Sequence, residues 1–331
     1  MENEKWNPGL LLQTSGAYWK SCTIHAGVKL DLFTIIGDEK LTSIDIASKS
    51  STDERGVNTL LNALVGLKLL EKENELYLNT PESKAFLSRD SEKNIIDMLM
   101  HHHHLVEGWG KLDKAVKEGK PVRQRTSFSD ETVRESFLMG MFNIAMGTAP
   151  LIVPFVDLSG KKSLLDLGGG PGTYAIHFCM VNPNLSATIF DLPTTKPFAE
   201  KIINKFGLEE KVKFQSGDFI LNEIKGKYDA IWLSHILHGE GPDDCQNIIN
   251  KAVKSLEPNG KIIIHEFILN NEKESPEFPT LFSLNMLIGT ENGRSYSENE
   301  LSQMLKKAGV KDVKRVRMKV PNDSGLMIGN I

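Results

Sequence analysis

The chain has few cysteines and no excess of positive charge, and each absence excludes classes of protein. The three cysteines, Cys22, Cys179 and Cys245, lie far apart in 331 residues. This spacing argues against a disulfide framework or a cysteine-based zinc site, and it favours a reducing cytoplasm. Lys and Arg number 39 against 43 Asp and Glu, a formal net charge of −4. A general nucleic-acid-binding protein normally has a basic excess, so that class is disfavoured.

The sequence also predicts neither a long apolar segment nor a secretion signal. We expect no run of the ~20 apolar residues that a bilayer-spanning helix needs. The first residues, MENEKWNPGL, are acidic and polar where a secretion signal would be basic and then apolar. A length of 331 residues exceeds what one hydrophobic core usually organises. The sequence therefore predicts a cytoplasmic protein of roughly two domains, with no membrane or nucleic-acid partner.

Residues 1–95 have the pattern of a winged helix. Helical spacing of apolar residues over 17–36 and 55–70 is followed by two short extended runs around a polar turn at Asn74. A DNA-reading module of this kind should be basic, but this segment has 11 Lys and Arg against 14 Asp and Glu, a balance of −3. We therefore interpret residues 1–95 as a winged-helix dimerisation domain.

Two further segments complete the predicted organisation. Residues 96–158 are expected to form a helical connector rich in His, Met and Phe that lines an acceptor pocket. Residues 159–331 alternate short β-branched runs with helical stretches, which predicts a doubly wound α/β sheet. Near the end of the chain, VKDVKRVRM alternates apolar and basic residues, which favours an edge strand with a solvated face over a nucleic-acid patch.

A glycine loop follows the first strand of this predicted sheet. The segment SLLDLGGGPGTY places Asp166 before Gly168, Gly170 and Gly172, and a helix then begins. Such a loop lets a ligand approach the backbone closely and offers free N–H groups at the helix start. A nicotinamide-binding loop would have glycine at Thr173, so a dehydrogenase is disfavoured. The spacing DxGxGxG resembles the first motif of methyltransferases that use S-adenosylmethionine.

An acidic residue lies at the carboxyl end of each of the next two predicted strands. Asp191 lies 19 residues beyond Gly172, where a carboxylate can accept hydrogen bonds from ribose hydroxyls. Asp218 is placed to accept from an adenine amino group, and Phe219 to lie against the ring. Taken singly, these residues are equally explained as a turn residue, a helix cap and core filling. Together they lie at consecutive strand ends, where open α/β sheets bind ligands.

With the glycine loop, FDLP, GDF, SHILHGEGPDDC and NGKIIIHEFIL in that order, essentially the whole chain resembles one family. It is the O-methyltransferase family of plant phenolic and bacterial polyketide-tailoring enzymes. The resemblance implies S-adenosylmethionine as cofactor and a homodimer in which each N-terminal module helps to close the partner's pocket. The cofactor contacts expected on this basis are Asp166, Gly168, Gly170, Gly172, Asp191, Leu192, Gly217, Asp218, Phe219 and Ser234.

The same resemblance implies catalytic roles for two residues. His238 matches the general base that takes the acceptor's proton, and Glu266 matches the glutamate that orients it. The sulfonium activates the methyl group by itself, so we expect no metal. His235 competes with His238 for the role of base, but we interpret it as a strand-end histidine satisfied locally.

The chain departs from the family pattern in three places. Gly239-Glu240 replaces an Asp-Trp pair after the base, Gly293 replaces an acidic helper two residues after Glu291, and Ser234 replaces a basic residue. These changes leave alternatives open. One is methylation of a ring carbon, and another is a cofactor-binding winged-helix regulator without turnover.

A small aromatic or polyketide-like acceptor is expected against the middle helices. Met139, Phe142 and Met146 share one helix face, although ordinary core packing explains them equally. The segments that form the acceptor pocket in the family also point to Trp109 and Met286, and Asn143 is a candidate polar contact. Four histidines, His101–His104, lie on all sides of a predicted helix and so cannot hold one metal. Of these four, we expect His104 to face the acceptor.

Overall fold

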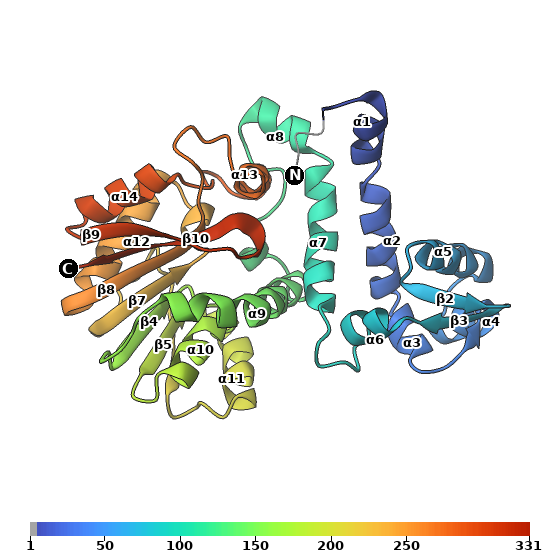
Figure 1. Cartoon of the computed structure of the whole chain (residues 1–331), viewed down its shortest axis with the longest axis horizontal. Helices are drawn as coiled ribbons and strands as arrows, with labels where there is room; N and C mark the ends of the chain where they lie inside the picture. The colour runs from blue at the N-terminus through green and yellow to red at the C-terminus, as the bar shows by residue number, and fades with distance from the viewer. Residues whose placement is uncertain (1–4) are drawn as a thin grey trace. The chain divides into compact units, whose positions relative to one another are not determined.

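A computed structural model describes residues 5–331, and the chain divides into two compact units between Leu105 and Val106. This division falls within helix α7 (Ile96–Trp109). The three-part division at residues 95 and 158 stays a prediction. Figure 1 shows the order of the elements along the chain.

The first unit consists of short helices around a small antiparallel sheet. Side chains that accept hydrogen bonds from the first turn start several of the helices: Asp53 accepts from Gly56 N, and Thr42 and Asp45 form a reciprocal capping box. The predicted hairpin is confirmed, with Asn74 in its turn at φ 57°. The sheet order is β1-β3-β2. The elements are α1 (Pro8–Ser15), α2 (Tyr18–Lys29), α3 (Leu32–Ile36), β1 (Leu41–Thr42), α4 (Ser43–Ser50), α5 (Glu54–Gly66), β2 (Leu70–Glu73), β3 (Leu76–Asn79) and α6 (Pro81–Leu87).

The second unit is built on a seven-stranded sheet of order β6-β5-β4-β7-β8-β10-β9. Strands β4 to β8 are parallel, and β10 runs antiparallel to both β8 and β9. The predicted doubly wound sheet is confirmed, and the VKDVKRVRM segment forms the edge strand β9. The strands are β4 (Ser163–Leu167), β5 (Ser186–Asp191), β6 (Val212–Ser216), β7 (Tyr228–Ser234), β8 (Leu256–Phe267), β9 (Lys311–Arg317) and β10 (Ser324–Asn330).

Helices cover both faces of this sheet, as Figure 1 shows. Buried side chains of α9, α10 and α11 pack on one face, and those of α12 and α14 on the other. The helices are α8 (Leu112–Glu118), η1 (Thr126–Phe128), α9 (Glu131–Ile152), η2 (Val153–Phe155), α10 (Thr173–Val181), η3 (Pro193–Thr195), α11 (Lys196–Lys205), η4 (Leu237–Gly239), α12 (Pro242–Lys254), α13 (Glu277–Gly289), α14 (Glu298–Lys307) and η5 (Pro321–Asp323).

We expected no segment that could span a bilayer, and by the two criteria of helix length and apolar composition this expectation is wrong. Glu131–Phe155 meets both criteria, because its Gly, Ser, Thr and Asn residues interrupt the apolar pattern without adding charge. In the structure, Ile152 and Val153 of this segment are buried in the same cluster as residues of the sheet. One third of its apolar window is buried, so the segment packs against the core of this unit over part of its length.

Candidate active site

The glycine loop joins β4 to α10 and holds three residues in the left-handed region. Gly168, Gly170 and Gly172 have φ values of 69°, 54° and 81°. At Gly172, a Cβ atom would also come within 2.2 Å of Ile189 Cδ1, so no other residue fits. Space for a Cβ is open at Gly170. The loop therefore presents backbone to an open region at the carboxyl edge of the sheet, where ligands of such folds bind.

Asp191, at the end of β5, braces this loop. Its Oδ2 accepts from Gly170 N at 2.8 Å, and its Oδ1 accepts from Leu192 N at 2.7 Å and Thr195 Oγ1 at 2.9 Å. A carboxylate has about four acceptor positions, so capacity for a ligand hydroxyl remains. Burial raises the pKa of Asp191, and these hydrogen bonds oppose that shift.

The residues that follow β6 lie beside the glycine loop and Asp191, as the sequence predicts. Gly217 N donates to Asp191 O at 2.9 Å, and Phe219 Cε1 lies 3.3 Å from the position that a Cβ at Gly168 would take. Asp218 Oδ1 accepts from Ile220 N at 2.7 Å and so also acts as a local cap. The structure therefore brings the loop, Asp191 and Phe219 to one edge of the sheet.

A lysine on α12 holds the segment that follows β6. Lys251 Nζ donates to Ile220 O at 2.6 Å, Asn222 O at 3.0 Å and Phe219 O at 3.3 Å. Charge-assisted hydrogen bonds of this kind are stronger than neutral ones. The ammonium group thus fixes the backbone that carries Asp218 and Phe219, although no sequence motif singles it out.

Asp166, at the end of β4, is a buried acid whose carboxyl group accepts few hydrogen bonds. It is 1% exposed, and its Oδ2 accepts from Ala175 N at 3.2 Å. Among the described residues, its Oδ1 has no hydrogen-bond partner. Burial raises the pKa of Asp166 to about 7.

This pKa predicts that stability depends on pH in a defined window. From about pH 4 to about pH 7 the unfolded chain ionises Asp166 while the folded chain keeps its proton, so the free energy of unfolding falls as pH rises. Asp166→Asn should remove this cost, because an amide oxygen still accepts from Ala175 N. We expect the variant to gain a few kcal/mol of stability over the native chain at pH 8 and little at pH 4. Denaturant unfolding of the ligand-free proteins at both pH values measures this, and an equal gain at both would contradict it.

His238 lies in η4, just after β7, and pairs with Glu266 near the end of β8. His238 Nδ1 is 2.8 Å from Glu266 Oε2, while Glu266 Oε1 accepts from Leu237 N at 3.0 Å and His238 N at 3.3 Å. The Glu266 side chain is 3% exposed and that of His238 is 13% exposed. Burial alone would raise the pKa of Glu266, but the His238 and His235 rings hold it well below its usual value. Glu266 is therefore ionised, and its bond to Nδ1 directs His238 Nε2 away from it.

His235 also faces Glu266, which the sequence did not predict. Its Nδ1 is 3.6 Å from Glu266 Oε2, beyond hydrogen-bond distance, so the interpretation of a locally satisfied ring is wrong for this atom. The residue has φ 55°, and its ring lies 4.2 Å from that of Phe267 and 4.3 Å from that of His265. Burial lowers the pKa of His235.

Ser234, expected at the cofactor, lies in a buried hydrogen-bonded chain. Its Oγ is 2.9 Å from His265 Nδ1, and His265 Nε2 is 3.0 Å from Ser324 Oγ. Burial lowers the pKa of His265 well below its usual value, so the ring is neutral. Ser234 thus holds a buried imidazole in place, and its contact with a cofactor stays a prediction.

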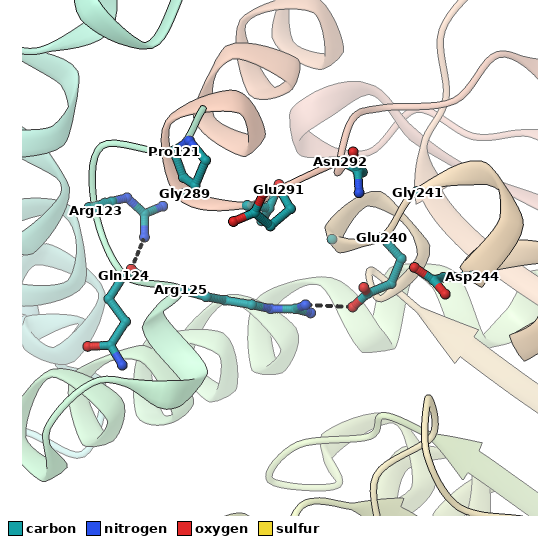
Figure 2. A pocket seen from close by; sticks show the side chains of 12 residues that line it. Pro121, Arg123, Gln124, Arg125, Glu240, Gly241, Asp244, Gly289, Glu291 and Asn292 are labelled. Atoms are coloured by element: carbon teal, nitrogen blue, oxygen red, sulfur yellow. Dashed lines mark hydrogen bonds and ion pairs between the residues drawn. The ribbon is translucent and has the colours of Figure 1, made fainter. Parts of the chain in front are cut away.

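A polar cavity of about 560 Å³ adjoins the backbone that follows His238. Figure 2 shows Arg125 pointing toward Glu240, and their side chains form an ion pair of 2.6 Å. At Gly239, a Cβ would meet Arg125 Nη2 at 2.8 Å, so glycine makes room for the guanidinium where the family pattern has aspartate. The lining residues are Pro121, Arg123, Gln124, Arg125, Gly239, Glu240, Gly241, Asp244, Gly289, Thr290, Glu291 and Asn292.

The residues expected at the acceptor do not line this cavity. Met139 and Phe142 pack against the core on the α9 face of the sheet, which fits the core alternative considered for them. Met286 is buried on α13. The acceptor roles of Met139, Phe142, Met146, Trp109, Met286, Asn143 and His104 stay predictions.

The doubly wound sheet and the glycine loop at its strand ends are typical of nucleotide-binding folds, and comparison with known proteins gives the family. Residues 109–311 match the O-methyltransferase domain, and residues 12–89 match the O-methyltransferase dimerisation domain. The chain is 29% identical to 3-hydroxy-5-methyl-1-naphthoate 3-O-methyltransferase of Streptomyces sahachiroi, over 97% of this chain and 95% of the relative. It is 30% identical to acetylserotonin O-methyltransferase of Gallus gallus, over 92% and 93%. The solved structure titled PigF with SAH superimposes with a TM-score of 0.89 at 25% identity, covering 98% of this chain and all of that one.

The chain belongs to the O-methyltransferase family. It is an enzyme that uses S-adenosylmethionine, as the resemblance in its motifs implied.

Lys251 provides a test of the cofactor edge that does not involve the reacting atoms. Lys251→Met keeps the aliphatic stem but removes three hydrogen bonds to the segment carrying Asp218 and Phe219. We expect the KM for S-adenosylmethionine to rise about tenfold, while kcat at saturating donor stays within about twofold. Lys254→Met is the matched control, since Lys254 lies on the same helix and, among the residues that the structure describes, its ammonium group pairs with the exposed Glu223. Steady-state kinetics in which both variants behave alike would contradict the bracing role.

Proposed function

We propose that this enzyme methylates a hydroxyl group of a small aromatic or polyketide-like acceptor, with His238 as the general base and Glu266 as its orienting carboxylate. The observation that carries the proposal is the 2.8 Å contact between His238 Nδ1 and the buried, ionised Glu266. We further propose a cytoplasmic homodimer built through the dimerisation domain. The exposed Trp6, Leu12 and Trp19 of the first unit support this, because large apolar side chains are commonly covered at interfaces.

The residues at the strand tips fit S-adenosylmethionine. The open space at Gly170 leaves room for a ligand next to the loop backbone. Asp191 retains acceptor capacity for ribose hydroxyls, and Phe219 lies beside the loop, where it can contact adenine. When bound, the sulfonium of this cofactor supplies a methyl group already activated for transfer, so the proposed reaction requires no metal.

The protein's own task is to remove one proton and to hold the acceptor oxygen in line. A phenol with a pKa near 10 is a poor nucleophile at neutral pH, whereas the phenolate is a good one. Because Glu266 occupies Nδ1, the neutral His238 ring has its proton on Nδ1 and a lone pair on Nε2. Nε2 takes the acceptor's proton, and the Glu266 carboxylate stabilises the imidazolium that forms.

The names of two relatives support the acceptor class. One is named for a hydroxynaphthoate and the other for acetylserotonin, and in both names the methyl group goes to oxygen. Both acceptors have a hydroxyl on an aromatic ring. The proposed acceptor of this enzyme therefore also has a hydroxyl group on an aromatic ring.

Transfer of a labelled methyl group tests the proposal. Purified enzyme is incubated with S-adenosylmethionine labelled with ¹³C at the methyl group and with a panel of hydroxylated aromatic acids, indoles and polyketide-like rings. We expect a product whose labelled carbon has the ¹³C shift of a methoxy group. A ring-bound methyl carbon would favour the alternative of C-methylation and would remove the need for a base at oxygen.

A further inference from the structure

Three nitrogen and oxygen atoms in the active site have the composition of a transition-metal site. They are His235 Nδ1, His238 Nδ1 and Glu266 Oε2, and all lie within 4.8 Å of one another. Two of the three separations are 2.8 Å, from His238 to Glu266, and 3.6 Å, from His235 to Glu266. Within the part of the chain that the structure describes, no other group of three such side chains is close enough to hold a metal ion.

We propose that these three side chains bind a divalent transition-metal ion such as Zn²⁺, and that the bound ion inhibits the enzyme. Two imidazoles and one carboxylate, with further positions open to water, form a common zinc ligand set. Metal–ligand bonds of about 2.0–2.2 Å would require the three donor atoms, which lie within 4.8 Å of one another, to move closer together around the ion. Hard ions such as Mg²⁺ prefer oxygen ligands and do not suit this set.

The local structure holds His235 in the required direction. Its backbone N–H donates to His265 O at 2.9 Å, and its ring packs against the rings of Phe267 and His265. The residue occupies the left-handed backbone region at φ 55°, which is uncommon for a side chain with a Cβ. Nδ1 is thereby aimed at Glu266, and it makes no hydrogen bond to any described residue.

Inhibition follows from the tautomer of His238 and rests on the proposed function. A metal ion on Nδ1 takes that nitrogen's lone pair, so the ring proton moves from Nδ1 to Nε2. The nitrogen that faces the acceptor then donates a hydrogen bond and has no lone pair with which to take a proton. The ion also neutralises part of the Glu266 charge. Metal binding and proton transfer therefore exclude one another at the same histidine.

Zinc titration of the purified full-length enzyme tests the proposal, with binding and turnover measured separately. Binding of ZnCl₂ is followed by competition with a chromogenic chelator, and turnover is followed with the acceptor found above. His235→Asn removes one ligand while keeping a residue type that tolerates the left-handed region. His102→Gln is the matched control, because it removes an exposed imidazole of the His101–His104 run instead.

We expect the native enzyme to bind one Zn²⁺ per chain at the site, to lose turnover about a hundredfold at saturation and to recover with EDTA. His235→Asn should bind zinc at least about tenfold more weakly, and its own turnover, measured without zinc as the reference, should need correspondingly more zinc for half-inhibition. His102→Gln should be inhibited like the native enzyme. Equal zinc affinity and inhibition in native enzyme and His235→Asn would overturn the proposal.

Two further outcomes separate this site from the proposed function. Zinc that binds in a His235-dependent way but leaves turnover unchanged would keep the metal site and remove His238 as the base. Absence of His235-dependent binding would remove the metal site and leave the base untouched. If His235→Asn does not fold, crystals of the native enzyme soaked in ZnCl₂ decide the matter. We expect an anomalous peak among the three atoms, and its absence there overturns the proposal.

Discussion

His238→Ala should lower kcat about a hundredfold or more while the enzyme still binds S-adenosylmethionine. The substitution removes the proton acceptor, and loss of a general base commonly costs this much. Cofactor binding should survive, because the loop, Asp191 and Phe219 are held by their own contacts at the strand tips. Steady-state kinetics gives kcat, and calorimetry with S-adenosylhomocysteine gives the affinity.

His177→Ala is the control for this experiment. His177 is another half-buried histidine of the same unit, but it lies on α10 and has no role in the proposed reaction. The turnover of the His177→Ala enzyme should stay near that of the native enzyme. A His238→Ala enzyme with native turnover would remove His238 from the mechanism.

Glu266→Gln should lower turnover by about a hundredfold or more through the tautomer of His238. The backbone N–H groups of Leu237 and His238 donate to Oε1, so the amide oxygen takes that place and the NH₂ group faces His238 Nδ1. Nδ1 must then accept a hydrogen bond, which leaves the ring proton on Nε2. A wrong tautomer of this kind costs about ten-thousandfold in a serine protease. The substitution also removes the charge that stabilises the imidazolium.

The readout for Glu266→Gln combines kinetics with nitrogen NMR. The ¹⁵N shifts of the His238 ring should show a proton on Nδ1 in the native enzyme and on Nε2 in the variant. Glu266→Asp keeps the charge but shortens the side chain, so it should retain the native tautomer preference and lose less turnover. Native turnover in Glu266→Gln, or an unchanged tautomer, would contradict the orienting role.

The sheet and the strand-tip loop were predictable because their signals are local. Five short apolar runs became β4 to β8, since β-branched residues flanked by helical stretches favour buried parallel strands. Parallel strands end at one edge of a sheet, so Asp191 and Phe219 were expected beside the glycine loop without any knowledge of packing. The His238–Glu266 pair came from the motif resemblance, and the structure shows the contact directly.

The other features depend on tertiary contacts that leave no mark in the local sequence. Arg125 pairs with Glu240, far away in the chain, and it accounts for the glycine at 239, which the family pattern alone presented only as a departure. The direction of the His235 ring follows from a left-handed backbone that few residues other than glycine adopt. Lys251 acts through carbonyl oxygens, which every residue has, so no spacing rule identifies it.

The pH dependence of turnover in His238→Ala, compared with the native enzyme, tests proton removal most directly. Without its base, the variant depends on acceptor molecules that are already ionised, so its rate should rise about tenfold per pH unit up to the acceptor's own pKa. The native enzyme, in which His238 takes the proton from the acceptor, should instead show a much weaker rise with pH. Parallel pH profiles for the two enzymes would contradict the assignment of His238 as the group that takes the proton.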